Sequence, residues 1–439
     1  DLLPYFRRSQ GAIDRKGAWH GVDGPVKTEA SVNFGELEEA FIEAAVACGH
    51  QRLDDFNGPH RAGVGRTDST VHRGIRQSSA ISYLAKPPSN LKILTHRQAV
   101  RVILEGGVAK GIETLGKEKI VAREEVILCQ GAFGTPQTLM LSGIGPAAHL
   151  NQHGINAVVD LPGVGQSLAD HVDVSMQYGS DRMDLSLARH QRLDRAAWLM
   201  ARWLFNGSGP GGGAFFSSVI FHGLNDPAMP EFETFMTPMT VHENMTDGEV
   251  EKAPLMQRLG RHLLVRGRQV AKPGVQIDIN LERPKSLGTV SLASANPLDH
   301  PRIDPRFFSH TDDLNAMVAG VKTMREIMAQ PEIAKYVTGE IGAWQGAKTD
   351  AQIIEAIRQT AYTGHHPCSS AKMGPDKDPL AVLDSELRVR GVDKLRVCDA
   401  SAMPSQITGN LNATVIAMAE RGADLILGKT PLVPEDPRI

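Results

Sequence analysis

Apolar residues recur at helical spacing in several stretches of the chain. Residues 35–50, GELEEAFIEAAVACGH, carry them on one face and end in a Cys-Gly pair that stops a helix. Residues 313–330 show the same amphipathic pattern, and residues 413–427 predict a long helix near the C-terminus. A shorter apolar helix is expected over 198–205, ahead of the flexible run GSGPGGG.

Between these helices the apolar pattern changes to that of strands. LKILTH (91–96), 99–106 and 108–115 predict successive strands. The run EVILC (125–129) is typical of a buried parallel strand, and LRVCDA (395–400) has the same character. The first of these runs leads into a helical pattern in which Thr135 fits the N-cap and Pro136 the first helical position.

The texture of the chain also predicts its domain organisation. Alternating runs such as GVQIDINLE (274–282) indicate an antiparallel sheet. The composition and the pattern of apolar residues change near residue 172 and change back near 375. We therefore expect a mixed α/β protein in which one domain (1–171 and 375–439) is split in sequence around another (172–374). The length of 439 residues is consistent with two or three domains at about 100–200 residues each.

Charge and composition narrow the class of protein. The net charge of −3 argues against a nucleic-acid-binding protein, which normally carries a basic domain. The four Cys residues are scattered without a CxxC pair, and no run reaches the roughly 18 apolar residues of a membrane span. The chain begins at Asp1, so we expect that a segment precedes it. Localisation stays open, with a soluble, cytoplasmic protein as the expectation.

Three short motifs could carry chemistry. The strand–turn–helix around Gly131 could bring backbone close to a phosphate, or could be only a tight connection. The pair His365-His366 could supply a general base, or could be a surface or packing feature. Asn410 and Asn412 open the last helix, where they could cap it or contact a ligand. Zinc ligands, GxSxG and a P-loop are all missing from the sequence, so no metal site is predicted.

The whole set of motifs resembles the glucose–methanol–choline (GMC) oxidoreductases, flavoenzymes that oxidise alcohols. GAFGTPQTLMLSGIGPAAHL (131–150) looks like the second signature of that family. The resemblance continues in order and spacing over nearly the whole chain, closest to the choline-dehydrogenase-like bacterial branch. It is carried by DLLPYF, WHGVDGPV, DFNG (55–58), RQSSAISYL (76–84), LPGVGQSLADH (161–171), RPKSLGTVSLAS (283–294), HPCSSAKMG (366–374) and the stretch 395–426.

The resemblance implies FAD as cofactor and hydride transfer from an alcohol carbon to flavin N5. It makes His366 the catalytic base and Asn410, 44 residues further on, the partner that holds the hydroxyl or alkoxide oxygen. His365, beside them, is the expected substrate contact. The resemblance further implies that FAD is bound by Ala99, Gly131, Ala132, Asp399, Ala400, Asn412 and Ala413, with the last helix directing its N-terminus at the flavin.

The sequence departs from the family pattern at several points. The dinucleotide fingerprint and its acidic partner are absent, and we expect them ahead of Asp1. Ser369-Ser370-Ala371 stands where Gly-Thr-Cys is commoner. His365 takes a position that is often aromatic in choline-active relatives, which weakens the case for a quaternary ammonium. We therefore predict an alcohol substrate without specifying choline.

Two alternatives stay open at this point. A truncated, FAD-deficient and inactive homologue is one, and a nicotinamide-dependent dehydrogenase without a visible fingerprint is the other. The electron acceptor, oxygen, quinone or another compound, is not fixed by any motif.

Overall fold

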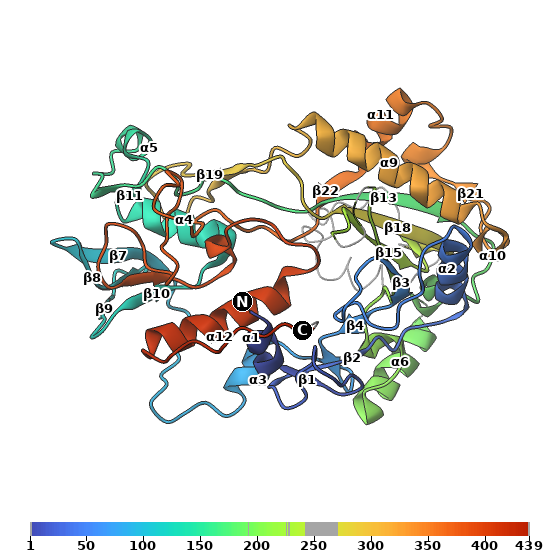
Figure 1. Ribbon diagram of the computed structural model, residues 1–439, viewed down its shortest axis with the longest axis horizontal. Helices are drawn as coiled ribbons and strands as arrows, with labels where there is room; N and C mark the ends of the chain where they lie inside the picture. The colour runs from blue at the N-terminus through green and yellow to red at the C-terminus, as the bar shows by residue number, and fades with distance from the viewer. Residues whose placement is uncertain (1, 192, 225, 227–228, 242–270, 438–439) are drawn as a thin grey trace.

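The computed structural model describes residues 2–437 except 192, 225, 227–228 and 242–270. It is a mixed α/β structure with two parts (Figure 1). One part is built on a large antiparallel sheet, drawn on the right. The other, on the left, contains a short parallel strand pair and the C-terminal helix α12 (Leu411–Ile426). The N-terminal end of α12 lies between the two parts.

Seven of the strands that the structure describes form the antiparallel sheet. Its long central strands are β13 (Val172–Gly179) and β18 (Gly274–Leu281), paired from Val172–Leu281 to Gly179–Gly274. Beyond β18 the order continues with β15, β14 and β3, while two short strands pair with the other edge of β13. These are β15 (Phe232–Thr237), β14 (Ser218–His222), β3 (Gly63–Arg66), β21 (Gly339–Glu340) and β22 (Ala361–Thr363).

Helices cover one face of this sheet. Strand alternation directs Val174, Met176, Ile277 and Ile279 to that face, where they are buried against the helices. The helices are α2 (Glu36–Ala47), α9 (Thr311–Met328), α10 (Pro331–Ala334) and α11 (Asp350–Thr360). The opposite face carries the intervening side chains, and these are mostly polar on β13 and β18.

A second core holds the parallel pair. β10 (Val126–Leu128) pairs in parallel with β23 (Leu395–Val397), and α4 (Gly131–Leu141) follows directly from β10. This core also takes in residues from α12 and from β7 (Ala99–Glu105) and β8 (Val108–Thr114), which with β9 (Lys119–Val121) form a three-stranded antiparallel sheet. The carboxyl ends of β10 and β23 therefore lie side by side, where open α/β sheets bind ligands.

The remaining elements connect or cover these parts. No helix among the described residues is both long and apolar enough to cross a membrane. The elements are α1 (Leu3–Ser9), α3 (Ser79–Leu84), α5 (Ala147–Gln152), α6 (Leu193–Asn206), β1 (Gln10–Ala12), β2 (Val26–Ala30), β4 (Asp68–Ser69), β5 (Val71–His72), β6 (Ile75–Arg76), β11 (Ile144–Gly145), β12 (Val159–Asp160), β16 (Thr240–Val241), β17 (Ala271–Lys272), β19 (Thr289–Ser291), β20 (Arg302–Asp304) and the 3-10 helices Leu187–Gln191, Pro210–Gly212, Gly342–Trp344 and Ala400–Ala402.

The start of α4 corrects a sequence prediction. The helix begins at Gly131, so Thr135 is not its N-cap and Pro136 lies inside the helix. Proline has no N–H to bond the carbonyl of residue i−4, here Ala132. The buried Ser370 hydroxyl donates to that carbonyl oxygen instead, at 2.5 Å. The proline is tolerated because a side chain from a distant loop replaces the missing donor.

Two further predictions differ from the structure. Residues 91–96 form no strand and are exposed, although they include two leucines and an isoleucine. The last helix starts at Leu411, two residues earlier than predicted. The domain boundaries at 171/172 and 374/375 stay a prediction, but α2 and β3, from the first segment, pack into the sheet's core.

Candidate active site

His366 and Asn410, the predicted catalytic pair, are in direct contact. Asn410 Nδ2 lies 3.0 Å from His366 Nε2. Asn410 is the N-cap residue of α12, yet its side chain makes no capping hydrogen bond and is directed at the histidine. The sequence hypothesis that this asparagine does more than cap a helix therefore agrees with its contacts.

The backbone of His366 is fixed from two sides. Its N–H donates to Asp170 Oδ1 at 3.0 Å, and its carbonyl accepts from Gln406 Nε2 at 3.0 Å. The second oxygen of Asp170 accepts from Thr363 Oγ1 at 2.5 Å. These contacts join the segments before β13, after β22 and before α12, so the position of the His366 ring is set by three parts of the chain.

Burial keeps His366 neutral near pH 7. Loss of solvation lowers the pKa of His366 to about 4, with a smaller contribution from the nearby His365. A neutral imidazole has one unprotonated nitrogen that can accept a proton. The residue can therefore act as a base without first losing a proton of its own.

Five of the predicted cofactor residues lie around the carboxyl ends of β10 and β23, namely Ala99, Gly131, Ala132, Asp399 and Ala400. Asn412 and Ala413 lie in the first turn of α12. Gly131 has φ +75, and a Cβ on it would point into open space. Asp399 holds the two loops together, since one oxygen accepts from Gly131 N and Thr135 Oγ1 and the other from Ser401. Gln130 Nε2 donates to the carbonyl of Ala99 at 3.0 Å, which brings that strand end to the same edge.

Comparison with known proteins identifies the family. Models of GMC oxidoreductases match residues 1–173 and 284–419. An oxygen-dependent choline dehydrogenase of Stenotrophomonas maltophilia (strain K279a) is 37% identical over 442 residues, covering 98% of this chain and 75% of that protein. The chain belongs to the GMC oxidoreductase family. It is an oxidoreductase that acts on CH–OH donors, and its cofactor is FAD.

Other proteins similar to this chain show how far the similarity extends. The oxygen-dependent choline dehydrogenase of Serratia proteamaculans (strain 568) is also 37% identical, over 98% of this chain and 75% of that one. Pyridoxine 4-oxidase from Mesorbium loti superposes with a TM-score of 0.80 at 26% identity, covering 98% and 77% of the two chains. A formate oxidase variant from Aspergillus oryzae RIB40 reaches 0.83 at 25%, covering 97% and 78%. Because their names give different substrates, the fold leaves the substrate open.

The site of this GMC oxidoreductase fits FAD. No side chain caps the first turn of α12, and Asn412 and Ala413 in that turn are exposed. The positive end of the helix dipole is thus free to face the electron-rich end of a flavin. The open turn at Gly131 and the adjacent Ala132 and Ala400 lie where a parallel strand pair accepts a nucleotide. Contacts of individual residues with FAD remain predictions.

The predicted substrate residue His365 lines a pocket whose lining includes neither His366 nor Asn410. It has φ +60, its N–H donates to Thr363 Oγ1, and its side chain lines a pocket of about 380 Å³. Phe133, Leu168 and Pro305 line the same pocket. The predicted substrate contact of His365 is thus untested, and this pocket is the one that its side chain would serve.

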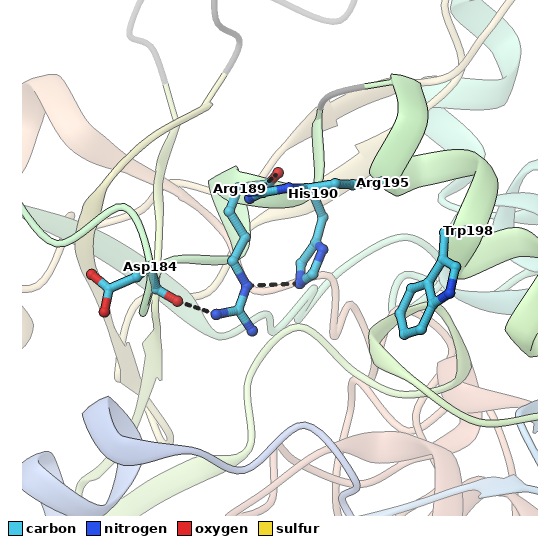
Figure 2. A pocket seen from close by; sticks show the side chains of 5 residues that line it. All are labelled: Asp184, Arg189, His190, Arg195 and Trp198. Atoms are coloured by element: carbon cyan, nitrogen blue, oxygen red, sulfur yellow. Dashed lines mark hydrogen bonds between the residues drawn. The ribbon is translucent and has the colours of Figure 1, made fainter.

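A second pocket, of about 540 Å³, contains none of the predicted site residues (Figure 2). Figure 2 shows the Arg189 guanidinium between the His190 ring, 3.0 Å away, and the backbone carbonyl of Asp184. Arg195 and Trp198 of α6 complete the lining. This pocket is separate in the chain from the catalytic pair and from the α12 terminus.

The sequence patterns did not reveal a group of carboxyl side chains on the face of the antiparallel sheet opposite the covering helices. Asp173, Glu233, Asp278 and Glu282 point away from the covering helices, and we call them the carboxyl face. Glu282 Oε2 accepts from the N–H of Gly409, next to Asn410. The sequence does carry a signal for this group, because acidic residues stand at alternate positions of apolar strands. DINLE (278–282), at the end of β18, is an example.

The carboxyl face is electrostatically unusual. Burial, with Asp278 and Asp170 nearby, raises the pKa of Asp173 to about 8. Burial also raises the pKa of Asp278. Burial, with Glu282 and Asp173 nearby, raises the pKa of Glu233, and burial, with Asp173 nearby, raises the pKa of Glu282. Asp173 Oδ1 and Asn280 Oδ1 have no hydrogen-bond partner among the described residues. Buried acceptors without donors are costly, so this face is suited to receive a donor or a cation.

Proposed function

We propose that this GMC oxidoreductase oxidises an alcohol to an aldehyde or ketone, with His366 as base and Asn410 as the partner of the substrate oxygen. The observation that carries the proposal is the 3.0 Å contact between His366 Nε2 and Asn410 Nδ2 at the uncapped N-terminus of α12. When bound, FAD supplies the hydride acceptor, flavin N5.

The two side chains divide the work on the hydroxyl group. A hydroxyl oxygen about 3 Å from both nitrogens accepts from Asn410 Nδ2 and donates its proton to His366 Nε2. As the proton leaves, negative charge grows on the oxygen, and the Asn410 amide stabilises it. Loss of the hydroxyl proton makes the carbon a better hydride donor. His366 is neutral at pH 7, so it is ready to take that proton.

Replacement of His366 tests the proposal. In His366→Ala we expect bound flavin to be reduced by an alcohol roughly 10²–10⁴ times more slowly, because the base is lost while FAD binding is kept. The measurement is anaerobic bleaching of the flavin absorbance by stopped flow. His190→Ala, in the separate Arg189 pocket, is the matched control and should keep the wild-type rate. An unchanged rate in His366→Ala would remove the base assignment. A protein that stays colourless with added FAD, or that no alcohol bleaches, would instead support the alternative of a FAD-deficient, inactive homologue.

A cationic alcohol is the substrate class that the carboxyl face favours. Residues facing each other across the strands form one row, Tyr362, Asp173, Asn280, Glu233 and Phe221. Aromatic rings thus flank the carboxyl groups at both ends, the composition of sites that hold quaternary ammonium groups. Relatives at 37% identity are choline dehydrogenases by name. The missing aromatic residue at His365 is therefore no argument against such a substrate, because this row offers rings of its own.

The substrate class can be tested with two alcohols of the same shape. Choline and 3,3-dimethylbutan-1-ol differ only in the charged nitrogen, so their kcat/KM ratio isolates the charge. We expect kcat/KM to be roughly ten- to hundredfold higher for choline than for the neutral alcohol. Each factor of ten corresponds to about 1.4 kcal/mol of differential binding free energy. Assays with oxygen and with an artificial acceptor, run in parallel, identify the usable electron acceptor. Equal kcat/KM values for the two alcohols would refute the cationic class and leave the role of His366 untouched.

A further inference from the structure

His171 is a buried histidine that lies behind His366. It comes directly before β13, and its side chain is fully buried. Its Nδ1 lies 3.0 Å from His366 Nδ1, and the two rings meet edge to face at 73°. Its other nitrogen, Nε2, lies 2.9 Å from the backbone carbonyl oxygen of Ile407. Both ring nitrogens of His171 are therefore in use.

The Ile407 carbonyl decides where His171 carries its proton. A carbonyl oxygen only accepts hydrogen bonds, so Nε2 of His171 must be the donor. Burial, and to a smaller extent His366, lowers the pKa of His171 to about 3, so the ring holds a single proton. Nδ1 of His171 is then unprotonated, and it can only accept.

The same logic carries the constraint to His366. Facing an acceptor at 3.0 Å, His366 Nδ1 must carry the proton of its neutral ring. His366 Nε2 is left unprotonated, on the side of Asn410. The Asn410 amide presents its Nδ2 donor to that atom, so the assignment is consistent at both ends of the chain of hydrogen bonds. The alternative tautomer would put two N–H groups against each other at Nδ1 or at Asn410.

We propose that His171 is a positioning residue that fixes the His366 tautomer, keeping Nε2 free to receive the substrate proton. The inference rests on the proposed role of His366 as base. The two ring nitrogens of His171 contact His366 and the Ile407 carbonyl oxygen, so in this proposal His171 acts only through His366. Without an acceptor at Nδ1, His366 could place its proton on Nε2 and would then be blocked as a base.

The surroundings hold His171 in this orientation. Gly364 leaves room for it, since a Cβ at Gly364 would lie 2.9 Å from His171 Cβ. Gly364 N–H donates to the His171 carbonyl at 2.8 Å. Glu282 Oε1 lies 3.7 Å from His171 Nδ1, too far for a good hydrogen bond but close enough to close off that side. Ile407 belongs to the loop that carries Asn410, so one loop orients both ends of the histidine pair.

Two variants of nearly equal shape separate tautomer control from packing. In His171→Asn, Oδ1 stands near the place of Nδ1 and can accept from His366, whereas His171→Leu offers no acceptor. Both lose the ring and the bond to Ile407. In His171→Leu we expect the rate of anaerobic flavin reduction to fall roughly 10²-fold or more, with KM within a few-fold of wild type. In His171→Asn the loss of rate should be at least tenfold smaller than in His171→Leu. Equal rates in the two FAD-bound variants would overturn the inference.

A spectroscopic measurement tests the same point without turnover. In holoenzyme labelled with ¹⁵N-histidine, long-range ¹⁵N–¹H spectra distinguish protonated from unprotonated ring nitrogens, and the spectrum of His366→Ala identifies the His366 signals. We expect His366 to be protonated at Nδ1 in wild type, and to show a mixture or the reverse in His171→Leu. Protonation of His366 at Nε2 in the wild-type protein would overturn the inference, even if the variants do not fold.

The experiments also separate this inference from the proposed function. If His366→Ala reduces flavin at the wild-type rate, the function assigned to His366 fails first. If His366→Ala is slow but His171→Leu keeps the wild-type rate with FAD bound, only the role of His171 fails. A slow His171→Leu with a less affected His171→Asn supports both.

Discussion

Single side chains decide whether local rules are kept or broken in this protein. Pro136 breaks the hydrogen-bond ladder of α4, and the chain answers with one hydroxyl, that of Ser370, on the Ala132 carbonyl. From the sequence, Pro136 was placed at a helix start because that is its usual position. The compensating serine is 234 residues away in sequence from the proline, so no local pattern could reveal it. At this position the commoner Thr of the family pattern also carries a hydroxyl, so Ser370 keeps the donor group although the residue differs.

Replacement of Ser370 should therefore cost stability. In Ser370→Ala the Ala132 carbonyl stays buried without a donor, and we expect the free energy of unfolding to fall by about 1–3 kcal/mol. Chemical denaturation at constant FAD concentration measures it. In a Pro136→Ala background the restored N–H can bond the carbonyl, so the cost of Ser370→Ala should shrink. A cost that is the same in both backgrounds would mean that the hydroxyl acts elsewhere.

The same scale shows the limits of the site prediction. His366 and Asn410 could be found because their motifs resemble those of a known family. His171 stands in LADH, a stretch that carried the resemblance, but no role followed from it. Its role depends on the contacts of both ring nitrogens, with residues 195 and 236 positions away. A sequence pattern lists the side chains and gives no information on such partners.

At the scale of elements, strand alternation separates a stable face from a functional one. On β13 and β18 the apolar positions meet the helices, and the positions between them carry Asp173, Asp278 and Glu282. The antiparallel character of this region was predictable from the alternating run 274–282. Which polar residues become buried was not predictable, since burial depends on how strands from distant parts of the chain are assembled. Local rules for burial fail here, as is common at binding sites.

The carboxyl face gives binding a pH dependence. Burial raises the pKa of Asp173 to about 8, so this carboxyl group is mostly protonated at pH 6, and the proposed cation would bind its ionised form better. Affinity of the holoenzyme for tetramethylammonium should therefore rise with pH, by up to about tenfold per unit below pH 8, and level off above it. Asp173→Asn should bind more weakly with a flatter profile. The same change at the exposed Asp376 is the control and should leave the profile unaltered. Titration calorimetry measures both, and weaker binding at high pH would contradict the prediction.

At the scale of the whole molecule, the site exists only where the two parts meet. Asp170 and His171 come from the start of the central sheet strand, His366 follows an edge strand, and Asn410 opens α12. The division of one domain around another was suggested by the shift in texture along the chain. The packing of α2 and β3 into the sheet was not, because their sequence, a helix and a glycine-rich stretch, is compatible with either part. Long-range packing therefore determines which of the two parts α2 and β3 join.

The parallel pairing of β10 with β23 has a consequence for how the protein is made. The paired residues of the two strands are 269 positions apart, as in Val126 and Leu395, and the contact between Asp399 and Gly131 spans 268 positions. Most of the antiparallel sheet lies between them in sequence. During synthesis β10 is made long before β23, so the edge of β10 stays unpaired until β23 has been synthesised. Closing so long a loop is slow, and an unpaired strand is prone to aggregation meanwhile. We therefore expect expression at low temperature or with chaperones to raise the yield of folded protein, because the part that contains β10 and β23 is completed last.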